Sequence, residues 1–321
     1  MKAAENRMAI GVDVGGTKID VGLVDHLGRI LEEAQESTDQ SGPLGPVEQI
    51  VRLIREVTWA RTVDLSDLAG VGIGVPGMPD TGNGGVWAPN VRGWTDFPLA
   101  RHLTERLGVP VVVENDGRTA ALGECWCGAG RGARSVALIV VGTGIGGGAV
   151  VDGELIRGRH GVAGAFGWFV IPGVGPRRPD LGDLESLAAG PVIGEQARKL
   201  AAAGDSPSML EIAGSVDKIT GRTAFAAAAG DPAARRLVRK WAEHLAMGIA
   251  NLVVVLDPDV IIIGGGVAAN FAQFEPDLRD ALAKYAHPFA RNELKIVPAG
   301  LGPRAGVIGA ARLALYSFER K

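Results

Sequence analysis

The sequence predicts an α/β protein with two domains, and three observations support this prediction. Apolar strand segments alternate with helical patterns along most of the chain, which is typical of α/β proteins. At 321 residues, the chain is longer than one compact core usually serves, so we expect two domains. A hairpin with a glycine turn occurs twice, at 9–20 and at 136–151, which indicates a duplicated scaffold.

The first hairpin reads AIGVDVGGTKID over Ala9–Asp20. An apolar strand carries Asp13, runs into the turn Gly15–Lys18 and then restarts. Glycine has no Cβ and tolerates positive φ, so the bare backbone can approach an anion at this turn. The acid just before the turn can hold Mg²⁺ through water, or it can be an ordinary turn acid.

The second hairpin, Val136–Val151, has its turn at Gly142–Gly144. Two such turns in one chain are what a nucleotide-dependent phosphotransferase needs. Neither fits the GxxxxGK[ST] loop or the dinucleotide GxGxxG pattern. Each turn taken alone is also compatible with a purely structural role.

Hydrophobic periodicity predicts the remaining elements. The segment 158–182 is irregular and rich in Gly, Pro and Arg, and a long loop of this kind is usually functional. We expect an N-terminal domain over 1–120, with the C-terminal helix 305–321 packed back on it, and a C-terminal domain over 121–304. Further strands are expected at 19–24, 29–35, 68–75, 111–114 and 260–263, and helices at 46–61, 99–107, 118–127, 190–203, 231–256 and 306–316.

Composition excludes several classes of partner. The net charge is −3 and the pI is about 6.0, so nothing argues for binding to nucleic acid or to an anionic membrane. No apolar run reaches the ~18 residues of a membrane span. We also expect no signal sequence before the first strand. Cys125 and Cys127 are too close for a normal disulfide. We therefore expect free thiols and a cytoplasmic protein.

Three further segments carry candidate chemistry. Asn115 and Asp116 end a strand, at the edge where ligand clefts of α/β proteins form. Asp116 can accept a hydroxyl proton during phosphoryl transfer, or it can cap the helix that follows. Gly264–Gly266 follow a strand and can admit a base or ribose, or can simply turn the chain. Asn90 is a polar side chain in a Gly/Pro/Trp loop and can hydrogen-bond a polyol.

In this order and spacing, the chain resembles the ROK family of sugar kinases (repressor, open reading frame, kinase), within the actin–hexokinase–Hsp70 ATPase superfamily. The resemblance covers nearly the whole chain. It rests on these segments: DVGGTK at 13–18, GVPG at 74–77, PNVRGW at 89–94, ENDGRTAALGE at 114–124, GTGIGGG at 142–148, GRHGVAG at 158–164, DLE at 183–185, DPDVIIIGGGV at 257–267 and GVIGAA at 306–311.

The resemblance implies a two-domain actin-like ATPase (ribonuclease H-like) fold with a cleft between the domains. It implies that ATP and Mg²⁺ are used to phosphorylate a primary hydroxyl of a small sugar or sugar-like polyol, with Asp116 as the catalytic base, in a homodimer. Phosphates, Mg²⁺ and adenosine would be held by Asp13, Gly15, Gly16, Thr17, Lys18, Gly142, Thr143, Gly144, Gly264, Gly265 and Gly266. Sugar hydroxyls would be held by Asn90, Asn115 and Glu185, and His160 falls in a loop of the same site.

The chain also departs from the family pattern. Where the family has AGExGH, this chain has AGAFGW, so Ala165 replaces a sugar-binding Glu and Trp168 replaces a zinc-binding His. The three family zinc cysteines align with Pro176, Arg178 and Asp183. All four zinc ligands are lost together, and His160 alone does not rebuild a site, so we expect no structural zinc. We expect the loop to be held by packing of Trp168 and by ion pairs of Arg177, Arg178, Asp180 and Asp183.

The changes at Ala165 and Trp168 also alter the expected substrate specificity, because a site that loses the acceptor for a substrate hydroxyl no longer selects for that hydroxyl. The sequence therefore predicts an acceptor altered at C1–C3, such as an aminosugar, a ketose or a carbocyclic C7-cyclitol. Three alternatives stay open: an ordinary glucokinase, a non-catalytic sugar-binding protein, and a transcription regulator of the family. Twelve residues precede Asp13, so we expect no DNA-binding domain ahead of it.

Overall fold

The computed structural model describes residues 7–80, 85–173 and 180–319, and the chain divides into two compact units. Unit 1 comprises the chain up to Leu138, Gly147–Gly164 and the chain from Gly300 onward. Unit 2 comprises Ile139–Gly146 and Ala165–Ala299. Each unit is described by itself.

Unit 1 is built on a five-stranded sheet in the order β3-β2-β1-β4-β7. Strand β1 is antiparallel to β2 and parallel to β4, which is parallel to β7. The strands in this unit are β1 (Met8–Val14), β2 (Lys18–Asp25), β3 (Ile30–Ser37), β4 (Leu68–Val75), β5 (Met78–Pro79), β6 (Val86–Trp87), β7 (Val111–Asn115) and β10 (Glu154–Leu155); the helices are α1 (Gly45–Ala60), α2 (Leu99–Leu107), α3 (Asp116–Cys127) and α10 (Ala305–Glu319).

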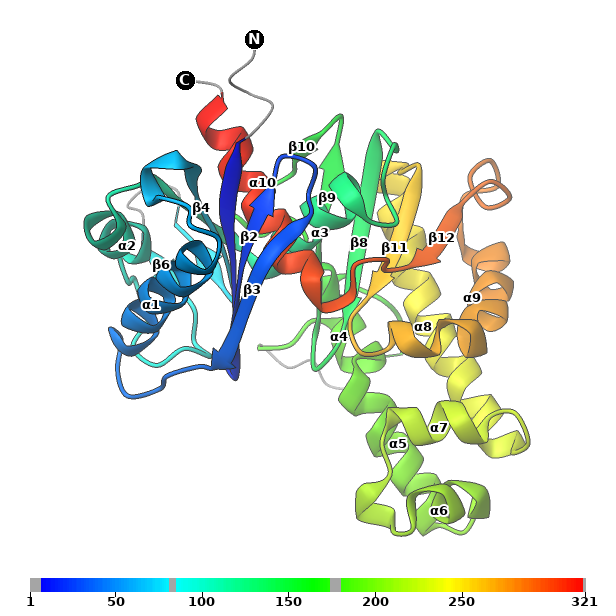
Figure 1. Cartoon of the computed structure of the whole chain (residues 1–321). Coiled ribbons are helices and arrows are strands. Elements are labelled where there is room, and N and C mark those ends of the chain that lie inside the picture. Colours follow the sequence, from blue (N-terminus) through cyan, green and yellow to red (C-terminus); the bar gives the residue numbers. More distant parts are fainter. Residues whose placement is uncertain (1–6, 81–84, 174–179, 320–321) are drawn as a thin grey trace. The chain divides into compact units, whose positions relative to one another are not determined.

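Alternation along β1 assigns its side chains to two different cores. Ile10, Val12 and Val14 belong to the core that α1 and α2 cover. Ala9 belongs to the core that includes α10, which packs on β1, β4 and α3 (Figure 1). A Cβ at Gly11 would collide with the backbone of α10, so glycine lets this helix lie directly on the sheet.

Strand register places the candidate residues of unit 1 at one edge of the sheet. Asp13 on β1 pairs with Gly74 on β4, and Gly74 pairs with Glu114 on β7. Asn115 ends β7 next to Val75. Because β1, β4 and β7 are parallel, these positions lie together at the carboxyl edge, where ligand sites of α/β sheets form.

A second five-stranded sheet has the order β10-β9-β8-β11-β12. In unit 2, the long helix α8 packs against α9, while α5, α6 and α7 contact one another (Figure 1). Strands β8 (Ser135–Val141) and β9 (Ile145–Val151) each have residues in both units. The elements that lie wholly in unit 2 are β11 (Val260–Gly264), β12 (Lys295–Pro298), α4 (Asp183–Ala188), α5 (Gly190–Ala202), α6 (Pro207–Ala213), α7 (Gly221–Ala227), α8 (Pro232–Leu256) and α9 (Phe271–Tyr285), with 3₁₀ turns that include Phe166–Trp168.

The α/β prediction is confirmed, and the expected strands and helices lie within two or three residues of the observed ones. One boundary differs in a way that matters. The helix expected from residue 118 begins at Asp116, because the side chain of Asn115 caps it. Among the helices that the structure describes, none is long and apolar enough to cross a membrane.

Candidate active site

Asp13 lies near the end of β1, on the face of the sheet that α10 covers. A Cβ at Gly306, in the first turn of α10, would collide with the Asp13 carboxylate, so that carboxylate lies directly against the bare backbone there. Burial, and then the charges of Asp116 and Asp20, raise the pKa of Asp13 to about 7. The Lys18 ammonium opposes this shift. Asp13 is therefore an acid that a nearby positive charge would ionise.

The surroundings of Asp13 fit a hard divalent cation. Within the described ranges, no group donates a hydrogen bond to its carboxylate, so both oxygens stay free as ligands. Carboxylate oxygen is the donor that Mg²⁺ takes in proteins, usually with several waters retained. Asp13 is thus suited to hold Mg²⁺, directly or through water, as the sequence predicts.

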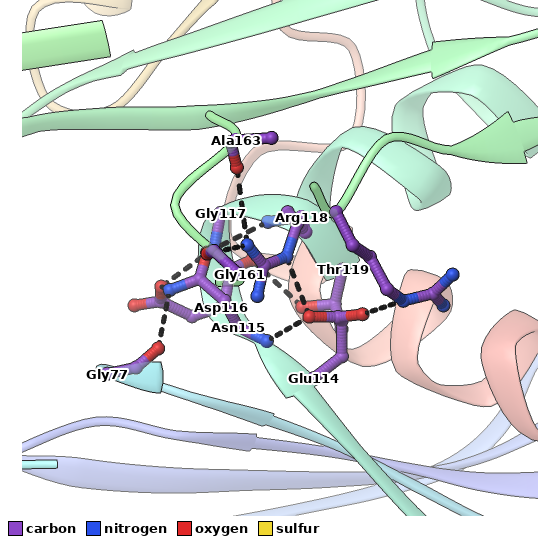
Figure 2. A network of polar contacts seen from close by, with 10 residues as sticks. Gly77, Glu114, Asn115, Asp116, Gly117, Arg118, Thr119, Gly161 and Ala163 are labelled. Atoms are coloured by element: carbon purple, nitrogen blue, oxygen red, sulfur yellow. Dashed lines mark hydrogen bonds and ion pairs between the residues drawn. The ribbon is translucent and has the colours of Figure 1, made fainter. Parts of the chain in front are cut away.

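Asp116 is the first residue of α3. Its Oδ1 accepts hydrogen bonds from the Gly117 amide at 2.7 Å and from the Asn115 side-chain amide at 3.0 Å (Figure 2). No hydrogen bond from another residue reaches its Oδ2 within the part of the chain described. Burial raises the pKa of Asp116 above its ordinary value, while the hydrogen bonds and the charge of Arg118 lower it. One oxygen is therefore held, and the other is left to accept a proton.

Asn115 is the N-cap of α3 and orients Asp116. Its Oδ1 accepts from the Arg118 amide at 3.2 Å, while its Nδ2 donates to the Gly77 carbonyl and to Asp116, both at 3.0 Å. The alternative in which Asp116 caps the helix is therefore wrong. Because both amide hydrogens of Asn115 are in use, only its oxygen has capacity left for a sugar hydroxyl.

The first glycine turn is closed by its own backbone and fastened from the segment after β3. The Gly15 amide donates to the Lys18 carbonyl at 2.8 Å, and Thr38 Oγ1 donates to the Gly15 carbonyl at 2.7 Å. Neither turn glycine has positive φ. Gly16 has no room for a side chain because the backbone of Asn90 lies close to it: a Cβ at Gly16 would lie 3.1 Å from the Asn90 carbonyl oxygen. Thr17 is exposed at the tip of the turn.

Gln40 joins this turn to the loop that carries Asn90. Its Nε2 donates to the Gly16 carbonyl at 2.9 Å and to the Asn90 carbonyl at 3.4 Å, and its Oε1 accepts from the Arg92 amide at 3.1 Å. The Asn90 side chain is exposed. The structure therefore brings the predicted phosphate turn and the predicted polyol residue into one connected group in unit 1.

A buried ion-pair cluster supports the helix that carries Asp116 (Figure 2). Glu114 Oε1 accepts from Arg118 Nε at 2.7 Å, and Glu114 Oε2 accepts from Arg157 Nε at 2.5 Å. Glu114 Oε1 also accepts from the Asn115 amide at 2.8 Å. Arg118 Nη1 donates to carbonyls in the loop 158–164, which carries the exposed His160.

The second glycine turn lies in unit 2 and is closed by a hydrogen bond from the Gly142 amide to the Gly144 carbonyl at 2.9 Å. A Cβ at Gly142 would meet open space, whereas one at Gly144 would lie 2.7 Å from Glu185 Oε2. The same oxygen of Glu185 accepts from the Ile145 amide at 2.6 Å. Thr143 is exposed at the tip. Glu185 thus supports the turn through Oε2, while its Oε1 accepts no hydrogen bond within the described residues.

The third glycine segment follows β11 in the same unit. Gly265 has φ +80°, and a Cβ there would collide with the backbone of Val141. Gly264 is buried at the strand end, while Gly266 is exposed and opens to free space. The bare backbone of Gly265 and Gly266 is therefore accessible at the position where the resemblance implies adenosine.

Ala165 and Trp168, also in unit 2, lie at the start and end of the 3₁₀ turn. Ala165 is exposed, and 57% of Trp168 is exposed. The expectation that packing of Trp168 holds this loop is therefore wrong. Two of the residues expected to form ion pairs, Arg177 and Arg178, lie outside the described residues, as does Pro176. Over the described ranges, no group of three or more His, Cys, Asp or Glu could hold a metal ion.

Sequence reasoning missed three supporting side chains, Gln40, Arg118 and Arg157. Each is a polar residue with at least one partner 24 or more residues away in the sequence. The one available signal was the position of Arg118, a charged residue just after the strand end at Asn115–Asp116.

The sheet order, the repeated glycine turns and the acid at the end of β1 define the actin-like ATPase class of fold. The chain belongs to the ROK family, whose pattern matches residues 9–317.

The comparisons with individual proteins agree with this assignment. The chain is 35% identical to a glucokinase from Thermotoga maritima over 310 residues, which is 95% of this chain and 96% of the relative. It is similar to the crystal structure of a ROK glucokinase from Streptomyces griseus in complex with glucose and AMPPNP, with a TM-score of 0.77, 36% identity, and coverage of 95% and 98% of the two chains. It is also similar to a ROK hexokinase from Thermus thermophilus, with a TM-score of 0.81, 32% identity, and coverage of 98% and 100%.

Proposed function

We propose that this chain is an ATP-dependent sugar kinase in which Asp116 is the catalytic base. The observation that carries the proposal is the unequal use of the Asp116 oxygens: Oδ1 is fixed by Gly117 and Asn115, while Oδ2 accepts no hydrogen bond from another described residue. A carboxylate held in this way can take the proton of an attacking hydroxyl without first reorganising. Membership of the ROK family and the similarity to glucokinases support the same reaction.

Phosphoryl transfer needs positioning and charge neutralisation more than covalent chemistry from the protein. The turns Gly15–Lys18 and Gly142–Gly144 offer bare backbone to the phosphates, and Gly264–Gly266 offer it to the adenosine. Asp13 would hold Mg²⁺, which when bound neutralises the phosphate oxygens. Asn90, Asn115 and Glu185 would bind sugar hydroxyls through the acceptor and donor groups left free. His160 is an exposed donor or acceptor in the neighbouring loop of unit 1.

We further propose that the acceptor is a hexose-like polyol that differs from glucose at C1–C3, such as an aminosugar or a carbocyclic C7-cyclitol. Ala165 and Trp168 support this, because they stand where the family pattern has an acceptor Glu and a His. A methyl group cannot accept the hydrogen bond of a hydroxyl, and a buried hydroxyl left unpaired costs about 1–3 kcal/mol. The competing hypothesis is an ordinary glucokinase; the similar proteins carry glucokinase names as well as aminosugar-kinase names, so the names favour neither acceptor.

The test is an ADP-release screen with ATP and Mg²⁺ against hexoses, aminosugars and cyclitols, each with and without a free hydroxymethyl group. Sugar-dependent ADP release, absent in Asp116→Asn, is the expected result. A protein that binds a sugar tightly but releases no ADP with any acceptor would instead be a non-catalytic sugar-binding member of the family. Polyphosphate in place of ATP serves as the donor control.

A further inference from the structure

The side chain of Arg118 is unusual for its burial. Both Arg118 and its partner Glu114 have side chains only 3% exposed, although they lie at the boundary between β7 and α3. Such a charge is stable in the interior only when its donors are satisfied. Three hydrogen bonds from the guanidinium are present in the described structure, and only one of them goes to the carboxylate.

The other two hydrogen bonds cross to a different segment. Arg118 Nη1 donates to the carbonyl of Gly161 and, at 3.2 Å, to that of Ala163, 43 and 45 residues further along the chain (Figure 2). The backbone amide of Arg118 is bound to the Asn115 cap at 3.2 Å. Arg118 therefore joins the first turn of α3, to which it belongs, to the middle of the loop 158–164.

Backbone packing leaves little freedom between these segments. A Cβ at Gly148 on β9 would lie 2.8 Å from the Arg118 Cα, and one at Gly117 would lie 2.9 Å from the Gly147 carbonyl oxygen. A Cβ at Gly164 would collide with Gly147. The loop and the first turn of α3 thus contact the same two residues of β9, and Arg118 spans the remaining distance between them.

We propose that Arg118 is a positioning residue of the kinase, which fixes the loop 158–164, with His160, against the helix turn that carries Asp116. The relevance of this to catalysis rests on the proposed function of Asp116. A fixed loop presents its groups to the acceptor sugar in one arrangement, so the sugar does not have to order the loop when it binds. Arg157, which precedes the loop, reinforces the same arrangement through Glu114.

Arg118→Lys is the informative variant, because lysine keeps the positive charge beside Glu114 but lacks the planar fork that reaches two carbonyls. We expect the loop 158–164 to exchange its amide hydrogens about tenfold faster, since hydrogen bonds from a charged donor are lost. We also expect the KM for the sugar to rise by about the same factor, with the KM for ATP nearly unchanged. The melting temperature should fall as well, because a buried charge loses hydrogen-bond acceptors. ATP hydrolysed per sugar phosphorylated should increase.

The matched control is Arg134→Gln, which removes an arginine from an exposed pair with Asp152 in the same unit, where the side chains are 84% and 62% exposed. It should change none of these quantities. Unchanged exchange in 158–164 for Arg118→Lys would overturn the proposal, and so would faster exchange with an unchanged KM for the sugar. Exchange is measured without substrates, so a wild-type protein that phosphorylates no sugar would contradict the proposed function and leave this measurement valid.

Discussion

Asp13 and Asp116 face the same glycine: a Cβ on Gly74 would lie 3.6 Å from Asp13 Oδ1 and 3.4 Å from the Asp116 Cα. Burial, and then the charge of Asp116, raise the pKa of Asp13 to about 7. Burial also raises the pKa of Asp116. The negative charge of Asp116 therefore disfavours ionisation of Asp13, and a cation held at Asp13 would favour it. Glycine is required at position 74 chiefly by Thr119, because a Cβ there would lie 2.7 Å from Thr119 Oγ1 and only in ordinary van der Waals contact with the two acids.

The first prediction is that Asp116→Asn abolishes turnover while nucleotide binding stays nearly intact. The amide cannot take a proton from the acceptor hydroxyl, but it preserves the shape of the side chain. A residual kcat above about a tenth of the wild-type value, roughly 1.4 kcal/mol of lost stabilisation or less, would show that Asp116 is not the base. The control is Asp152→Asn, which changes an exposed aspartate that no part of the proposed site uses.

The second prediction concerns the pH dependence of stability. The pKa of Asp13 rises from 3.8 to about 7 on folding, so between these values the folded state binds the proton that the unfolded state has lost. This contribution is therefore present below about pH 4, and stability is lost as the pH rises towards about 7. Asn cannot ionise, so Asp13→Asn removes this pH dependence. In the absence of Mg²⁺, the melting temperature of the variant relative to that of the wild type should therefore rise as the pH increases from about 4 to about 7.

Mg²⁺ provides the complementary measurement for Asp13. A cation bound to the ionised carboxylate stabilises the folded state by mass action. Mg²⁺ should raise the melting temperature of the wild type more above about pH 7, where Asp13 has lost its proton, than at lower pH, where protons compete. The same response in Asp13→Asn would show that Mg²⁺ stabilises the protein elsewhere.

The third prediction separates the two roles of Asn115. Asn115→Ala removes the N-cap of α3 and should cost about 1 kcal/mol of stability. Asn115→Ser keeps a capping oxygen but has no amide to donate to Asp116 Oδ1 or to Gly77. Both variants lose this amide, so both should have a low kcat, while the stability of Asn115→Ser should return towards that of the wild type. Urea unfolding and steady-state kinetics on the same samples measure the two quantities. Recovery of both in Asn115→Ser would mean that capping is the only role of this side chain.

The fourth prediction is that the purified protein holds no stoichiometric zinc and that chelators do not unfold it. The resemblance to the family pattern places Trp168, Pro176, Arg178 and Asp183 at its four zinc positions, and of these only Asp183 has a side chain that commonly binds zinc. Elemental analysis is the direct measurement, and a melting curve with chelator is the second. About one zinc per chain, or a large loss of melting temperature with chelator, would contradict the prediction.

How much the sequence could predict depended on how local each signal was. The hairpins were predictable because the glycine turn and its flanking apolar strands are continuous in sequence, and the strand end at Asn115–Asp116 was equally local. The hydrogen bonds that hold these segments in place could not be predicted, because they join residues far apart in the sequence. Gln40 bonds to residues 24 and 50 positions away, and Arg118 bonds to one 43 positions away. The joint loss of the four zinc ligands favoured a packed indole at Trp168 in place of the metal, and only the structure shows that the indole is largely exposed.

The last prediction tests the origin of acceptor specificity. Ala165 and Trp168 stand where the family pattern has Glu and His, and both are exposed in unit 2, so larger or more polar side chains can be placed there without disturbing a core. If they set specificity, the wild type should have a low kcat/KM for glucose and a higher one for a polyol altered at C1–C3. Ala165→Glu should then raise kcat/KM for glucose by about tenfold or more, because a carboxylate pairs with the hydroxyl that was left without an acceptor.

Two comparisons make this last test decisive. Ala165→Gln offers a neutral acceptor of the same length and should give a smaller gain, because hydrogen bonds to a charged group are stronger. Glucose, mannose, fructose, N-acetylmannosamine, aminoglucoses and cyclitols should be ranked for each variant by kcat/KM rather than by kcat, since this ratio measures discrimination between substrates. Wild-type protein that ranks glucose first, at about 10⁴ M⁻¹s⁻¹ or above and thus within the ordinary enzyme range, would show an ordinary glucokinase. In that protein, hydroxyl recognition would rest on Asn90, Asn115 and Glu185 without help from residue 165.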